Sequence, residues 1–92
     1  EYTKAVQKNS GHFKAFINRG YIYNERKEYD KAISDYKRGI ELDPNSAFGY
    51  YNLGVAYFSS GNKDKAAESF RQAANLGDSD ASDWLKANGY GQ

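Results

Sequence analysis

The sequence has no cysteine, a single histidine and a single proline, and its charges almost cancel. Without cysteine, disulfides and thiolate metal sites are excluded, and the redox compartment stays open. Its 13 basic and 12 acidic side chains give a net charge of +1 at pH 7, which lacks the positive excess typical of nucleic-acid binders. No apolar run approaches the roughly 18 residues that span a bilayer, and a signal-peptide core is missing. We expect a soluble cytoplasmic or periplasmic protein, with no nucleic-acid partner and no membrane insertion.

Side chains that carry catalysis or bind metals are also scarce. His12 has no cysteine or second histidine with which to form a base–nucleophile pair or a metal cage. The acidic run DSDASD at residues 78–83 lacks the glycine and the bidentate glutamate of a calcium loop. Its acids are expected to cap the N-terminus of a final helix instead. We therefore expect no enzyme and no cofactor, and neither catalytic nor metal-binding residues.

The sequence does contain a repeat of 34 residues. A shift by this length aligns seven identical pairs, which are Asn18 with Asn52, Gly20 with Gly54, Tyr23 with Tyr57, Asp30 with Asp64, Lys31 with Lys65, Ala32 with Ala66, and Leu42 with Leu76. Two series of aromatic residues keep the same register: Phe16, Tyr50 and Trp84, and Tyr2, Tyr36 and Phe70. The repeat therefore extends past both ends of its two full copies.

Each copy contains two helical patterns, because its apolar residues recur at steps of three and four. The predicted helices lie near residues 1–9, 13–25, 29–42, 47–60 and 63–76, with a capping helix near 80–88. Gly61 and Asn62 suit a helix C-terminus and the following N-cap. The first copy lacks this glycine, so Asn24 or Lys27 must make its turn at some conformational cost. Pro44 separates one copy from the next.

Two helices per copy, a period of 34 and fixed small and aromatic positions resemble the tetratricopeptide repeat. The matching residues are Phe16, Gly20, Tyr23, Ala32, Tyr36 and Pro44 in the first copy, and Tyr50, Leu53, Gly54, Tyr57, Ala66 and Phe70 in the second. Arg19 replaces the usual leucine, Gly39 a small alanine and Asp78 the proline. The resemblance implies an all-α solenoid of antiparallel helix-turn-helix repeats with a C-terminal capping helix. The stretch AANLGDSDASDWL is also similar to the Sel1-like repeat, which implies a solenoid too.

The resemblance implies one domain with four segments. Residues 1–12 look like the end of a preceding repeat with its connector, residues 13–46 and 47–80 like two full repeats, and residues 81–92 like a capping helix and tail. The chain opens without methionine and as if in mid-helix, so the sequence leaves open whether it is a fragment of a longer repeat array.

Packing inside each repeat is expected to depend on small residues that face one another. We predict that Gly20 faces Ala32 and that Gly54 faces Ala66, so that paired helices approach closely. Aromatic residues at helical spacing are expected to fill the wedges between helices, and these are Phe16, Tyr23, Tyr36, Tyr50, Tyr57 and Phe70.

A second apolar stripe in the second copy has no role in this predicted core. It consists of Phe48, Tyr51, Val55 and Phe58, at steps of three and four. By resemblance, the first helices of repeats line a concave peptide-binding groove, which adds Ile17, Tyr21 and Asn24. Asn52 bonds either a ligand's backbone or groups within its own helix pair. The alternative for the stripe is that the capping helix covers part of it with Ala81, Trp84 and Leu85.

The carboxylate clamp of some tetratricopeptide grooves is incomplete in this sequence. By resemblance, Asn52 and Lys86 suit the clamp, but Ile17, Tyr21 and Ser82 stand where Lys, Asn and Lys are needed. Two isolated donors do not hold both terminal carboxylates in charge-assisted geometry. We therefore expect an aromatic, weakly charged groove that binds a peptide segment of an unknown protein partner.

Two function classes follow, and an enzyme is a distant third. In the first, the chain is a protein-interaction module. In the second, it is a structural spacer or assembly unit whose apolar surface is covered by neighbouring repeats or a second chain. The N-terminal helix, with Tyr2, Ala5 and Val6, is expected to leave an apolar flank through which chains self-associate.

Overall fold

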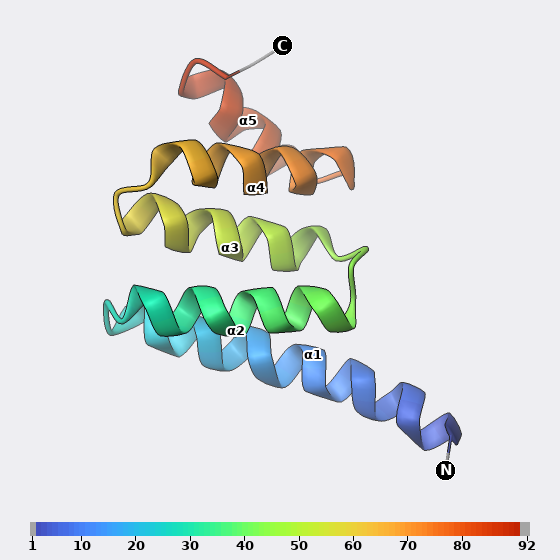
Figure 1. Cartoon of the computed structure of the whole chain (residues 1–92). Helices are drawn as coiled ribbons and strands as arrows, with labels where there is room; N and C mark the ends of the chain where they lie inside the picture. The colour runs from blue at the N-terminus through green and yellow to red at the C-terminus, as the bar shows by residue number, and fades with distance from the viewer. Residues whose placement is uncertain (1, 91–92) are drawn as a thin grey trace.

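The computed structural model describes the backbone of residues 2–90 and the side chains of residues 12–90. The described backbone forms five helices and no strand, and the helices are α1 (Tyr2–Glu25), α2 (Tyr29–Leu42), α3 (Ala47–Ser59), α4 (Lys63–Asn75) and α5 (Ser79–Ala87). Helices α1 and α2 pair, α3 and α4 pair, and α5 packs against α4 at the C-terminal end (Figure 1). The prediction of an all-α stack of helix-turn-helix units with a C-terminal cap is confirmed. Within this part of the chain, no helix is both long and apolar enough to cross a membrane.

The predicted break near residues 10–12 is wrong, because α1 continues through it from Tyr2 to Glu25. Asn9, Ser10 and Gly11 are weak helix formers, but only proline would block the helix outright, and this stretch contains no proline. Residues 2–9 therefore form no separate helix. The side chains of Tyr2, Ala5 and Val6 lie outside the described residues, and so does the predicted apolar flank.

The predicted helix ends agree with the structure. Gly61 has φ +94°, Asn62 accepts a hydrogen bond from the Lys65 backbone N–H at 3.2 Å, and Asp78 caps α5 through the Ala81 N–H at 3.1 Å. In the first turn Lys27 takes the left-handed conformation, with φ 65°. Of the two candidates for this turn, Lys27 is therefore the residue that makes it.

The nearest neighbours of the repeat's two equivalent glycines are aromatic rings. An ideal Cβ on Gly20 would lie 2.8 Å from Cε1 of Tyr36, and one on Gly54 would lie 2.8 Å from Cε1 of Phe70. Ala32 and Ala66 are fully buried. The glycine–alanine contacts stay a prediction, and the ring one turn beyond each alanine on the second helix is the group that lies over the glycine.

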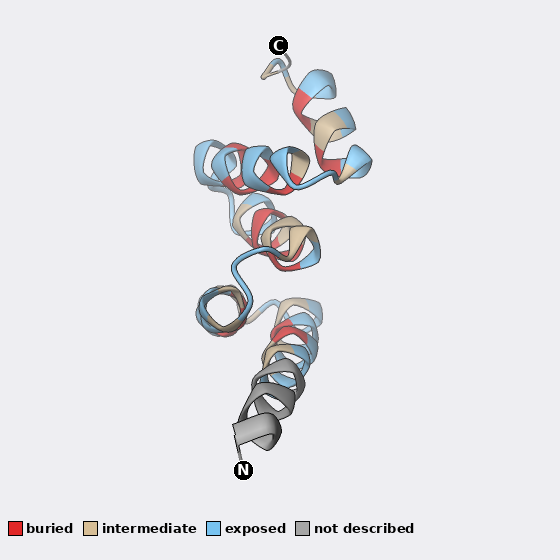
Figure 2. Cartoon of the chain, turned by 90° about the vertical axis from the view of Figure 1, so that its right-hand side faces the viewer, coloured by how far each residue is buried: buried red, intermediate tan, exposed pale blue. Residues whose placement is uncertain are grey.

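The core has two clusters, one on each side of α3. The first joins α1, α2 and α3 through Ile17, Ala32, Tyr36, Leu53 and Ala56, and the second joins α4 and α5 through Ala66, Ala67, Phe70, Ala73, Ala81 and Leu85. Figure 2 shows buried residues on the helix sides that face neighbouring helices. Of the six aromatic residues predicted to fill the wedges, Tyr36 and Phe70 are fully buried and the other four are half-buried. Burial raises the pKa of Tyr36 to about 12.

Candidate peptide-binding groove

The eight residues predicted to line a groove lie on α1 and α3, but they differ widely in exposure. Tyr21, Phe48 and Phe58 are 54%, 59% and 47% exposed. Asn24, Tyr51 and Val55 are half-buried, and Ile17 and Asn52 are buried. A ligand can therefore reach three large apolar side chains directly, and the other residues contribute less or nothing.

Ile17 belongs to the core and not to an exposed surface, so its assignment to the groove is wrong. It is 2% exposed, and its Cδ1 atom lies 2.8 Å from where a Cβ of Gly39 would be and 3.8 Å from where a Cβ of Gly49 would be. These two glycines, on α2 and α3, leave room for the isoleucine between the helices. The glycines at positions 39 and 49 were the sign in the sequence that a side chain of another helix enters the core there.

Asn52 makes its hydrogen bond within its own helix. Its Nδ2 group donates to the Phe48 carbonyl at 2.9 Å, and the residue is 9% exposed. Of the two interpretations left open by the sequence, this contact matches the local one. The Oδ1 atom of Asn24 accepts no hydrogen bond among the described residues, but it is buried, so a ligand does not reach this oxygen in this structure.

The stripe on α3 is partly anchored in the core. Tyr51 lies 5.4 Å from Phe70 between ring centroids, and Phe58 meets Trp84 edge-on at 5.5 Å. Trp84 in turn lies 4.5 Å from Phe70. The capping helix therefore covers part of the Phe58 end of the stripe, as the alternative interpretation proposed, while Phe58 stays 47% exposed and Phe48 at the other end 59% exposed.

Trp84 is the aromatic residue that the groove prediction missed. It is half-buried on α5 and borders the exposed Phe58 ring. Its place in the series Phe16, Tyr50 and Trp84 was visible in the sequence. That register places it on α5 at the position that Phe16 and Tyr50 hold on α1 and α3.

The surface around these rings offers little for ions. Tyr21 is exposed and neutral where a clamp needs an amide, and Ile17 is buried where it needs a lysine. No group of three or more acidic or histidine side chains that would hold a metal occurs among the described residues. The surface can therefore bind by apolar and aromatic contact.

The family models agree with the helical hairpins. A model described as a TPR repeat matches residues 20–61, and a model described as a tetratricopeptide repeat matches residues 47–80. The chain belongs to the tetratricopeptide-repeat family. Its two pairs of helices and its half-repeat α5 are the elements of this tetratricopeptide stack.

This tetratricopeptide domain is similar to segments of larger proteins and to a solved structure. Protein bimA of Emericella nidulans is 34% identical over 80 residues, covering 87% of this chain and 10% of that protein. Hsp70-Hsp90 organizing protein 1 of Glycine max is 35% identical over 71 residues, covering 77% of this chain and 12% of that protein. The second TPR of Spaghetti (RPAP3), bound to the HSP90 peptide SRMEEVD, is similar with a TM-score of 0.75 and 27% identity, over 80% of this chain and 68% of that chain. The chain thus spans about a tenth of the length of these two sequence relatives.

Proposed function

We propose that this chain is a protein-interaction module that holds a peptide segment of a partner against α1 and α3. The observation that carries the proposal is the exposure of three large apolar side chains, Tyr21, Phe48 and Phe58, on these two helices. Exposed aromatic groups that are not needed for packing are typical of binding surfaces. The similar structure that holds an HSP90 peptide supports the same use of the fold.

The proposed ligand is an apolar or aromatic segment rather than a free C-terminal carboxylate. Ile17 is buried, Tyr21 carries no amide, and Ser82 carries no charge. The surface therefore lacks the paired cations that bind a carboxylate strongly. Within this proposal, residues 13–46 and 47–80 are the repeats, and residues 81–92 are the cap and tail.

Selection from a random peptide display library tests the proposal, with the peptide SRMEEVD as a second probe. We expect selected peptides to be rich in aromatic and aliphatic residues and to bind more tightly than SRMEEVD. The double variant Tyr21→Ala with Phe48→Ala should weaken their binding about tenfold or more, with an unchanged melting temperature, because both side chains are mostly exposed. Leu76→Ala is the matched control, because Leu76 is 40% exposed at the end of α4.

Two results would contradict the proposal. If the double variant binds selected peptides as tightly as the unmodified chain, the site lies elsewhere. If SRMEEVD binds more tightly than every selected peptide, the expected ligand class is wrong.

The alternative is a spacer or assembly unit whose exposed rings are covered by neighbouring repeats or a second chain. The observation that favours it is the small share of the two sequence relatives that the chain spans. Sedimentation of the isolated chain separates the two functions: a spacer with uncovered rings should self-associate, and Tyr21→Ala with Phe48→Ala should suppress that association. Self-association through the N-terminal flank stays a separate prediction, which this double variant would leave unchanged.

A further inference from the structure

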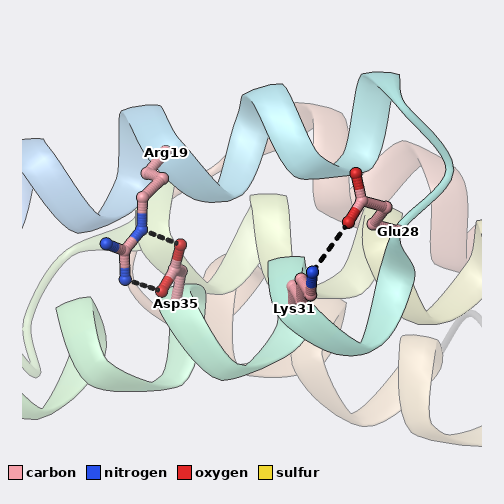
Figure 3. A network of polar contacts seen from close by, with 4 residues as sticks. All are labelled: Arg19, Glu28, Lys31 and Asp35. Carbon is pink, nitrogen blue, oxygen red and sulfur yellow. Dashed lines mark hydrogen bonds and ion pairs between the residues drawn. The ribbon is translucent and has the colours of Figure 1, made fainter.

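The outer side of the first repeat carries an ion pair with nearly ideal geometry. Arg19 on α1 donates from Nε and Nη2 to the two carboxylate oxygens of Asp35 on α2, each at 2.8 Å (Figure 3). The Asp35 side chain is 7% exposed, whereas that of Arg19 is 58% exposed. The hydrogen bond and the charge of Asp35 raise the pKa of Arg19. The pair lines a surface hollow of about 450 Å³ whose other described residues also come from α1 and α2, and they are Phe16, Ser34, Lys37, Arg38 and Glu41.

The second repeat has the equivalent hollow, with a volume of about 350 Å³. Five residues that line the second hollow lie 34 positions after residues that line the first. They are Tyr50, Leu53, Glu68, Ser69 and Gln72, the counterparts of Phe16, Arg19, Ser34, Asp35 and Arg38. It has one lining residue from outside its own repeat, Lys37 of α2. The second repeat thus shows how a preceding helix packs on this side, with Leu53 buried at 7% exposure.

Both members of the ion pair differ from their counterparts in the second repeat. Arg19 stands in place of Leu53, and Asp35 stands in place of Ser69. Ser69 and Asp35 are equally buried, at 6% and 5% exposure. The two changes are matched, because a buried carboxylate without its arginine would be an unpaired charge.

The Arg19 guanidinium also takes the position beside Tyr23 that Lys37 of the preceding helix takes beside Tyr57 in the second repeat. There, the Tyr57 ring has Lys65 of its own repeat at 5.7 Å and Lys37 of α2 at 5.9 Å. The equivalent Tyr23 ring has Lys31 at 5.5 Å and Arg19 at 5.9 Å. The first repeat therefore supplies from its own α1 the cation that the second repeat receives from α2.

We propose that Arg19 and Asp35 close this side of the stack, so that it takes neither a further helix nor a second copy of the chain. A helix packed here as α2 packs on Leu53 would remove water from the exposed guanidinium. The loss of hydration of an ion pair offsets or exceeds what the new contact contributes. This role concerns α1 and α2 on the side of Phe16, and it is independent of peptide binding by Tyr21 and Phe48.

The test converts the first repeat into the second. Arg19→Leu with Asp35→Ser should produce an apolar side that stacks on another copy, and self-association measured by sedimentation should become about tenfold tighter or more than in the unmodified chain. Lys86→Leu with Asp83→Ser is the matched control. It removes one positive and one negative charge from two exposed residues of α5, away from this hollow. This control should associate no more tightly than the unmodified chain.

The proposal is overturned if the Arg19 and Asp35 double variant stays as monomeric as the unmodified chain, or if the control associates equally. Should the double variant not fold, the reverse exchange in the second repeat tests the proposal. Leu53→Arg with Ser69→Asp places the pair beneath α2 and should lower the melting temperature by about 10 °C. The control is Leu53→Ala with Ser69→Ala, which measures how much of this change comes from losing the leucine side chain alone. If the charged pair lowers the melting temperature no more than this control does, an ion pair does not prevent a helix from packing, and the proposal is wrong.

Discussion

At the scale of single residues, this domain depends on rings that lie over glycines. Tyr36 covers Gly20 and Phe70 covers Gly54, with two ring carbons of each within 2.9 Å of where a Cβ would be. Both rings are at least 98% buried and join neighbouring helices. The glycines repeat at 34 residues because no side chain fits between the first helix and this ring.

We predict that Gly54→Ala lowers the free energy of unfolding by about 1–3 kcal/mol, although alanine favours helix, because a Cβ overlaps Phe70. Urea denaturation followed by circular dichroism measures the change. Gly49→Ala on the same helix is the control, since its nearest neighbour is an aliphatic carbon of Ile40 at 3.1 Å. Equal losses in the two variants would show that the Phe70 ring is not what excludes the side chain.

At the scale of elements, the turns after α1, α3 and α4 share one geometry. Lys27, Gly61 and Gly77 have φ of 65°, 94° and 104°. In each turn the next backbone N–H reaches back across the helix end, from Glu28 to Tyr23, Asn62 to Tyr57 and Asp78 to Ala73, at 2.8 to 3.0 Å. Two turns have the residue that this conformation favours, and the first has a lysine in its place.

We predict that Lys27→Gly stabilises the domain by up to about 1 kcal/mol, because glycine adopts positive φ without the steric cost of a side chain. Thermal unfolding measures the change. Arg26→Gly, one residue earlier and not at positive φ, should instead destabilise, because it only adds freedom to the unfolded chain. A loss of stability in Lys27→Gly as large as in Arg26→Gly would contradict this account of the turn.

At the scale of the whole molecule, α5 is held on the stack by apolar and aromatic packing. Trp84 of α5 contacts Phe70 and Phe58 and stacks on Tyr90 at 5.9 Å. The Tyr90 hydroxyl donates to Asp64 on α4 at 3.0 Å, which raises the pKa of Tyr90. Under our proposal the side of the first repeat that carries Arg19 and Asp35 is closed by charge, so the two surfaces use different chemistry.

We predict that truncation after Asp78 removes most of the thermal unfolding transition. Deleting α5 exposes the apolar side of α4, and a stack this small has roughly 5 kcal/mol to lose. Circular dichroism and binding of a hydrophobic dye should report the change. Truncation after Tyr90, which keeps α5, is the control. A cooperative transition that survives without α5 would show that the cap is not required.

The sequence by itself determined the features that depend on near neighbours in the chain. The 34-residue repeat, helices α2 to α5, the caps at Asn62 and Asp78 and the left-handed Gly61 all follow from spacing and local hydrogen bonding. The family resemblance rested on the same local pattern. These features can be predicted because residues on one helix face recur every three or four positions and each cap hydrogen bond joins residues three positions apart.

Only the tertiary structure decided which side chains meet between helices. The period of a helix does not say how far the helix is rotated against its neighbour, and adjacent faces differ by one residue. Ile17, which the resemblance placed in the groove, lies in the core because Gly39 and Gly49 leave room for it. The rings of Tyr36 and Phe70 over Gly20 and Gly54 likewise became visible only in the structure. The Arg19–Asp35 pair joins residues 16 apart on two helices, and only the rotation and separation of α1 and α2 bring the guanidinium and the carboxylate together.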